Sequence, residues 1–146
     1  MEDDIIFHKN FHDEFKKKYK YLIDREKNVD LLYLGCSQSL GGNGYWNKTK
    51  FKKNYYDNYY TDGTFAMLIN KKKYKNILKY TNTYNIPIDT SISKYILSPK
   101  KYKCYSFFPH IITSNVGLLS NTDNKKRNKN TYFKSNKIDI NNFDNL

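Results

Sequence analysis

The residues near the start of the chain whose types and spacing fit a chemical role are acidic. Glu2, Asp3 and Asp4 are consecutive, and they precede the apolar residues Ile5 and Ile6. Two carboxylates with one residue between them offer the hard oxygen ligands that Mg²⁺ and Mn²⁺ bind. Such a cation would in turn bind a diphosphate. The triplet therefore predicts a divalent-cation site, and the alternative interpretation is a solvated acidic chain start.

Three other constellations give weaker indications. His8 and His12 are four residues apart, so one helix face can present both, but the sequence HKNFH lacks the Glu of the HExxH zinc motif. The GGNG run at residues 41–44 is not followed by the Lys-Ser/Thr pair of a phosphate-binding loop. Cys36 has no histidine partner that the sequence identifies, so a thiol nucleophile has little support. We interpret these features as surface histidines and a flexible turn.

The first half of the chain predicts a helix and a buried strand that position these residues. Residues 2–7 (EDDIIF) fit the end of a strand and the turn after it. Asn10 is a candidate helix cap, and apolar residues follow it at helical spacing (Phe11, Phe15, Tyr19 and Leu22). The apolar run Leu31–Gly35 predicts a buried strand. Residues 36–60 predict a long loop, and such a loop inside a compact domain is usually functional.

The second half continues the alternation. Two more buried strands are predicted at Thr64–Asn70 and Lys103–Pro109. Between them, Asn70 is expected to cap a helix with Tyr74, Ile77 and Leu78 facing inward, and Asp89 to begin a short helix carrying Ile92, Tyr95 and Ile96. Residues 121–146 are rich in Asn, Lys and Asp, which predicts a polar, disordered tail after a domain at residues 1–120. The alternation indicates the α/β class, with a mixed sheet and flanking helices.

Composition restricts the classes of protein and ligand. No run approaches the ~20 apolar residues of a membrane helix, and no secretory signal is visible, so an intracellular location is expected. The two cysteines, Cys36 and Cys104, form no CxxC motif, which excludes a zinc module and a disulfide framework. The net charge is +12, but only Arg25 and Arg127 of the 26 basic residues are arginine. Arginine is the residue preferred for bidentate contacts to phosphate and guanine, so the charge alone is weak evidence for nucleic-acid binding. Residues 31–120 carry 13 basic residues against 3 acids, which favours an anionic ligand such as a nucleotide diphosphate or DNA.

Five sequence blocks in order resemble glycosyltransferase family 25, the lipooligosaccharide and procollagen galactosyltransferase family, which has relatives in giant viruses. The blocks are EDDIIF, LLYLG, DGTFAMLINKKKYKNIL, IPIDTSISKYI and CYSFFPHIITSNVGLLS. They match the family's acidic EDD, strand ending in LG, GT(F/H)A block, P(I/V)D block and aromatic-Pro strand. The resemblance covers residues 1–120. It implies the acceptor-side half of a GT-A type nucleotide-sugar transferase.

The resemblance also implies an activity and assigns residues to it. The activity would be metal-dependent transfer of a hexose from a nucleotide-diphosphate sugar to a hydroxyl of a glycan or protein acceptor, with inversion. Glu2 and Asp4 would be the outer members of the DxD-like motif that holds Mn²⁺ or Mg²⁺. Gly63 and Thr64 would form a tight turn beside the sugar or acceptor, and Asp89 would take the proton of the acceptor hydroxyl.

Two further positions are candidates on the same resemblance. His110 would match a late histidine that contacts the metal or diphosphate in some such folds, although a histidine at a strand end is more often structural. Gln38, in the segment after the LG strand, would contact the acceptor. The alternative for Asp89 is a plain helix cap.

Departures from the family pattern leave alternatives open. Family members have a substantial segment before EDD, so we expect a domain truncated at its N-terminus, or a partner chain that supplies the nucleotide-binding half. Ser120 is followed by Asn121 where relatives often have Asp. A non-catalytic remnant or a glycan- or protein-binding module is the first alternative, and a basic nucleic-acid-binding protein is the less favoured second. The Lys- and Asn-rich composition fits an AT-rich genome such as that of a giant virus, which would place the protein in the host cytoplasm or the virion.

Overall fold

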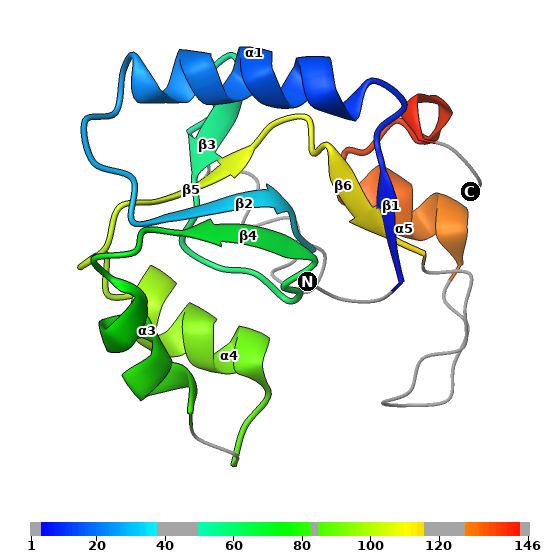
Figure 1. Cartoon of the computed structure of the whole chain (residues 1–146). Coiled ribbons are helices and arrows are strands. Elements are labelled where there is room, and N and C mark those ends of the chain that lie inside the picture. The colour runs from blue at the N-terminus through cyan, green and yellow to red at the C-terminus, as the bar shows by residue number, and fades with distance from the viewer. Residues whose placement is uncertain (1–3, 38–49, 83–84, 116–127, 144–146) are drawn as a thin grey trace.

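The computed structural model describes residues 4–37, 50–82, 85–115 and 128–143. Its centre is a mixed four-stranded sheet with the order β3-β5-β2-β4 (Figure 1). The strands are β2 (Leu31–Gly35), β3 (Tyr55–Asp57), β4 (Ala66–Ile69) and β5 (Cys104–Phe107). β2 and β5 run parallel, with Leu31 opposite Cys104. β4 and β3 pair antiparallel with β2 and β5 and form the two edges.

A second, two-stranded sheet lies beside the end of β2. It pairs β1 (Ile5–Phe7) with β6 (Ile112–Ser114) in antiparallel register, with Ile5 opposite Ser114. Gly35, the last residue of β2, meets this sheet so closely that a Cβ there would overlap the carbonyl oxygen of Ile112. Leu34 also accepts a backbone hydrogen bond from Ile111 at 3.0 Å. A residue without a side chain is therefore required where the two sheets join.

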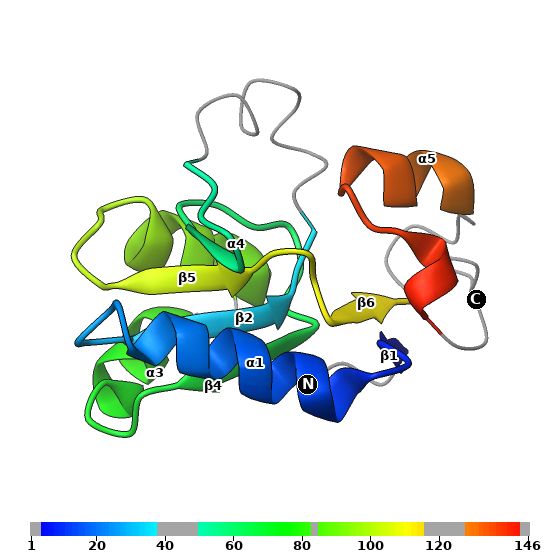
Figure 2. The same ribbon diagram turned by 90° about the horizontal axis from the view of Figure 1, so that it is seen from above.

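Helices cover both faces of the central sheet (Figures 1 and 2). On one face lies α1 (Phe11–Ile23), and on the other lie α3 (Tyr74–Thr81), α4 (Ile88–Ile92) and a π-helical turn, η1 (Ser93–Leu97). Because side chains of a strand alternate between faces, Leu32 and Leu34 pack toward α1 while Leu31 and Tyr33 pack toward α3 and α4. Two hydrophobic clusters result, one on each face of the sheet.

The α/β class, the mixed sheet and the flanking helices are confirmed by this arrangement. The apolar runs at residues 31–35, 64–70 and 103–109 contain β2, β4 and β5. The sequence analysis missed β3, which lies inside the expected loop at residues 36–60, and it missed β6. Residues 2–7 were expected to form the end of a strand and the turn after it. In the structure a strand, β1, instead begins at Ile5, after the acidic residues.

The expected tail at residues 121–146 was wrong for its described part, residues 128–143. This segment forms α5 (Lys129–Ser135) and a 3-10 turn, η2 (Ile140–Asn142). Four of its apolar side chains are buried in the cluster on the α1 side of the sheet: Tyr132, Phe133, Ile138 and Phe143. These four apolar residues are few and widely spaced within a polar segment, so the composition did not indicate that the segment folds.

The inward face of α3 also differs from expectation. Ile77 is buried, but Tyr74 and Leu78 are exposed large apolar side chains. The helix cap is Lys73, and Asn70 instead accepts a hydrogen bond from the backbone N–H of Lys72 in the preceding turn. α3 therefore buries Ile77 fully and packs Tyr80 against the same cluster as a partly buried side chain. Within the described ranges, no helix has the length and apolar character needed to cross a membrane.

Candidate functional site

The two central strands, β2 and β5, are parallel, so their carboxyl ends lie side by side at the same end of the sheet. We call this end of the sheet its carboxyl edge. Ligands of open α/β sheets bind at such an edge, since the loops that follow the strands diverge there. Cys36 and Ser37 follow β2, and His110 follows β5. The residues that surround this edge form the candidate site.

The segment Thr61–Thr64 is fastened to this edge by backbone and hydroxyl contacts. Asp62 donates its backbone N–H to the carbonyl oxygen of Ser37 at 2.9 Å. The backbone N–H of Thr61 donates to Ser93 Oγ at 3.1 Å, and Ser93 Oγ donates to the Thr61 carbonyl at 2.7 Å. Thr61 Oγ1 donates to the Gly63 carbonyl at 2.8 Å and closes the turn. The turn is thereby held between the end of β2 and η1, whose first residue is Ser93.

Tyr60 is bonded to one carboxylate, and the charge of a second one also acts on it. The Tyr60 hydroxyl donates to Asp62 Oδ1, and this bond, together with burial and the charges of Asp62 and Asp89, raises the pKa of Tyr60 to about 12. Asp89 is half-buried in the first turn of α4 and accepts a hydrogen bond from the Thr90 N–H at 2.6 Å. Burial, with smaller contributions that include the charge of Asp89, also raises the pKa of Tyr33. Asp89 is the second residue of α4, and the helix cap is Pro87 instead.

The structure places Gly63 and Thr64 in this turn, and both are buried. A Cβ at Gly63 would lie 2.6 Å from the ring of Phe65. Gly63 is therefore needed for close packing on this ring. Asp62 was not singled out in the sequence, although its place directly before the GT pair within a segment poor in acids was a usable signal.

Asp4 occupies the start of the two-stranded sheet. Its Oδ2 accepts a hydrogen bond from Ser114 Oγ at 2.7 Å, and its backbone oxygen accepts from the Asn115 N–H at 2.7 Å. Among the described residues, Asp4 Oδ1 takes no hydrogen bond. One oriented oxygen of this kind suits a hard cation. Glu2, the second expected metal ligand, and Gln38, the expected acceptor contact, lie outside the described residues.

His110 is separated from Asp4, so the structure does not bring these two expected metal ligands together. The β1–β6 register sets Asp4 beside Asn115, whereas His8 donates its backbone N–H to Ile111, the neighbour of His110. Four residues of strand span about 13 Å. Within the described ranges no three His, Cys, Asp or Glu side chains are grouped as a metal site.

His110 instead belongs to a buried polar cluster between the carboxyl ends of β2 and β5. Its Nε2 lies 3.2 Å from the Tyr56 hydroxyl and 3.8 Å from Cys36 Sγ. Ser106 Oγ lies 3.6 Å from the same sulfur and accepts a hydrogen bond from Asn58 Nδ2 at 2.8 Å. Burial, with a smaller effect of the Lys18 ammonium, lowers the pKa of His110 to about 4, so its ring is neutral at neutral pH.

The sequence analysis missed the contact between Cys36 and His110 because 74 residues separate them. A signal was available: each follows a predicted buried strand, and parallel neighbours bring the residues after their ends together. Cys36 is fully buried. The cluster therefore holds the sheet edge together through polar contacts and does not expose a thiol.

Comparison of the chain with protein-family models, with curated proteins and with solved structures finds no match. The chemistry of the sheet edge follows from its own residues. Asp62 and Asp89 can accept protons or hydrogen bonds from hydroxyl groups, and Asp4 offers one oxygen to a cation.

Proposed function

We propose that the chain carries the acceptor side of a metal-dependent hexosyltransferase, which transfers a sugar from a nucleotide-diphosphate donor to a hydroxyl group. The observation that carries this proposal is the hydrogen bond of Asp62 to Tyr60 in the turn that is fastened to the end of β2, with Asp89 near enough for its charge to raise the pKa of Tyr60. An edge of this kind binds ligands in α/β sheets. The order of the five sequence blocks, which resembles glycosyltransferase family 25, supports the same activity.

In this proposal each carboxylate has a separate task. Asp89 accepts the proton of the acceptor hydroxyl as its oxygen attacks the anomeric carbon. Asp62, already bonded to the Tyr60 hydroxyl, orients the acceptor. Asp4, fixed by Ser114, would hold Mg²⁺ or Mn²⁺ together with Glu2. When bound, the cation supplies positive charge against the negative charge that develops on the departing diphosphate.

The proposal is tested by the release of nucleoside diphosphate from UDP-hexoses with Mn²⁺ and a hydroxyl acceptor. Asp89→Asn keeps the size of the side chain and removes the base, so we expect kcat to fall by about 10²–10⁴-fold with an unchanged melting temperature. Asp24→Asn makes the same chemical change at the exposed end of α1 and should leave turnover unchanged. Turnover of Asp89→Asn at the wild-type rate would contradict the role of Asp89.

Binding of the donor nucleotide is measured separately. Mn²⁺ with UDP should raise the melting temperature of the wild-type chain by mass action, and Asp4→Asn should lose that increase. If the wild-type chain shows neither turnover nor a metal-dependent increase, the proposed function is wrong.

A further inference from the structure

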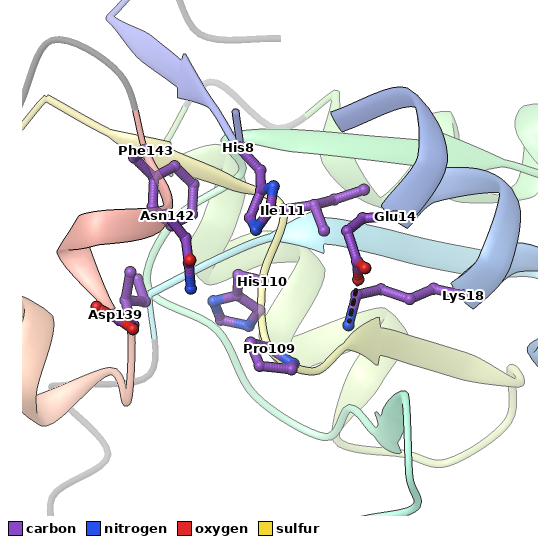
Figure 3. Close-up of a pocket in the computed structure, with 10 residues that line it drawn as sticks. His8, Glu14, Lys18, Pro109, His110, Ile111, Asp139, Asn142 and Phe143 are labelled. Atoms are coloured by element: carbon purple, nitrogen blue, oxygen red, sulfur yellow. Dashed lines mark ion pairs between the residues drawn. The ribbon is translucent and has the colours of Figure 1, made fainter. Parts of the chain in front are cut away.

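A pocket of about 290 Å³ lies on the α1 side of the sheet, beyond the His110 cluster (Figure 3). Three segments enclose it: the first half of α1, residues 109–111 after β5, and residues 138–143 around η2. It is lined by His8, Glu14, Lys18, Pro109, His110, Ile111, Ile138, Asp139, Asn142 and Phe143. Its volume is at the lower end of the ~300–1,000 Å³ of small-molecule pockets, so it admits a single ring.

One wall of the pocket carries a buried ion pair. Lys18 is only 3% exposed, and its Nζ donates to the Phe108 carbonyl at 3.1 Å. The same nitrogen lies 3.6 Å from Glu14 Oε2, while Glu14 Oε1 accepts from Lys17 outside the pocket. An ammonium group has three protons, so these two contacts leave Lys18 able to donate once more. Glu14 Oε2 remains an acceptor on the same wall.

Two histidines add polar nitrogens to the pocket. His8 Nδ1 accepts the backbone N–H of Asn10 at 3.0 Å, and burial lowers the pKa of His8, so the neutral ring carries its proton on Nε2. His110 is 3% exposed, and within the described part of the chain its Nδ1 has no hydrogen-bond partner. An unpaired buried polar atom is unfavourable for the folded chain. A shift of this ring that exposed Nδ1 would let a ligand oxygen bond to it.

The opposite wall is apolar, and the charges of the pocket nearly balance. Ile111, Ile138 and Phe143 supply the apolar surface. Figure 3 shows the Asn142 side chain directed toward His110. One ammonium faces two carboxylates, Glu14 and Asp139, so the pocket has no excess of positive charge for an anion.

We propose that this pocket binds one ring of a neutral polyhydroxyl compound, a monosaccharide or a cyclitol. Each hydroxyl of such a ring both donates and accepts, which matches Glu14 as an acceptor and Lys18, His8 and Asn142 as donors. The C–H groups of the ring pack on the apolar wall. This binding requires neither a cation nor a nucleotide, and it is therefore independent of the proposed transferase.

The test is a titration of the ¹⁵N-labelled chain with D-galactose, D-glucose and myo-inositol, without metal or nucleotide. Sugars are added to roughly 50 mM, above the ~1 mM Kd of a weak small-ligand complex. We expect the backbone signals of His110, Ile111 and Asn142 to shift, together with the Nδ1 resonance of His110. Absence of these shifts with all three compounds would overturn the proposal.

Two variants and two charged compounds make the test specific. Asn142→Ala should weaken binding by about three- to tenfold, as loss of one hydrogen bond does. Asn141→Ala, an equal truncation at the neighbouring exposed residue, should have no effect. D-glucuronate should bind more weakly than the neutral rings and more weakly than D-glucosamine, because two carboxylates face one ammonium. Tighter binding of D-glucuronate, or equal affinities of the two variants, would refute a site for neutral rings.

Discussion

At the scale of the residue, Gly35 controls how closely the two sheets approach. A Cβ at this position would overlap the Ile112 carbonyl, which belongs to the backbone and cannot rotate away. Gly35→Ala must therefore separate β2 from β6. We expect it to lower the free energy of unfolding by about 2–3 kcal/mol or more, measured by urea denaturation.

Gly63→Ala is the matched control for this prediction. Its added Cβ would meet the far end of the buried Phe65 ring, a side chain that must shift within the core but is not backbone. We expect a smaller loss of stability for Gly63→Ala than for Gly35→Ala. Equal losses would show that the contact between β2 and β6 is not what requires a glycine at position 35.

Glu26 joins the end of α1 to β3 and β5. One of its oxygens accepts hydrogen bonds from Lys52 and Tyr55, both at 2.6 Å, and the other accepts from Tyr105 at 2.8 Å. Burial opposes ionisation, but these three hydrogen bonds prevail and lower the pKa of Glu26 to about 2. The folded chain therefore favours the ionised carboxylate.

This shift predicts a pH dependence of stability. Because the folded pKa of about 2 lies below the ordinary 4.5, the unfolded chain binds more protons between these values. The contribution of Glu26 is fully present above pH 4.5 and is lost as the pH falls toward 2. Glu26→Gln should cost about 1.5–3 kcal/mol at neutral pH and progressively less in acid, measured by urea unfolding. A constant difference across this range would contradict the assignment, and Asp24→Asn serves as the exposed control.

At the scale of the element, a strand could be predicted from sequence where its residues form a continuous apolar run. β2, β4 and β5 are continuous apolar runs, so they were found from sequence. β3 and β6 have three residues each and receive their partners only from distant strands. The acid Asp62 could be seen in the sequence, but its place at the end of β2 depends on the turn that is held against Ser37 and Ser93. Long-range contacts of this kind leave no local periodicity.

The helix α5 was also not predicted, because it lies in a segment rich in Asn and Lys. Phe133 is 3% exposed in the cluster on the α1 side, so Phe133→Ala should cost about 3–5 kcal/mol of unfolding free energy. Lys134→Ala changes the exposed neighbour in the same helix and should cost less than about 0.5 kcal/mol. Thermal unfolding followed by circular dichroism distinguishes the two variants. Similar stabilities would mean that the helix contributes little to the core.

At the scale of the whole molecule, the uneven charge along the sequence is partly compensated by folding. Acids of the first 30 residues lie beside lysines of the basic middle: Glu26 pairs with Lys52 at 2.6 Å, and Asp30 lies 3.9 Å from Lys73. The net charge of +12 remains, but the contrast between segments diminishes when they pack. A strongly basic sequence average therefore does not by itself define an anion-binding face.

The burial of both cysteines beneath α3 and α4 makes each thiol a reporter of how often this helical layer opens. Cys36 and Cys104 belong to the cluster on that face, and burial raises the pKa of Cys104 to about 12. A thiol reagent can then react with Cys104 only during excursions that open this packing. Ile96→Ala should speed this labelling while Lys94→Ala, an exposed neighbour, should not, and immediate labelling of the wild-type chain would contradict the packing. The rate would give the lifetime of the closed layer.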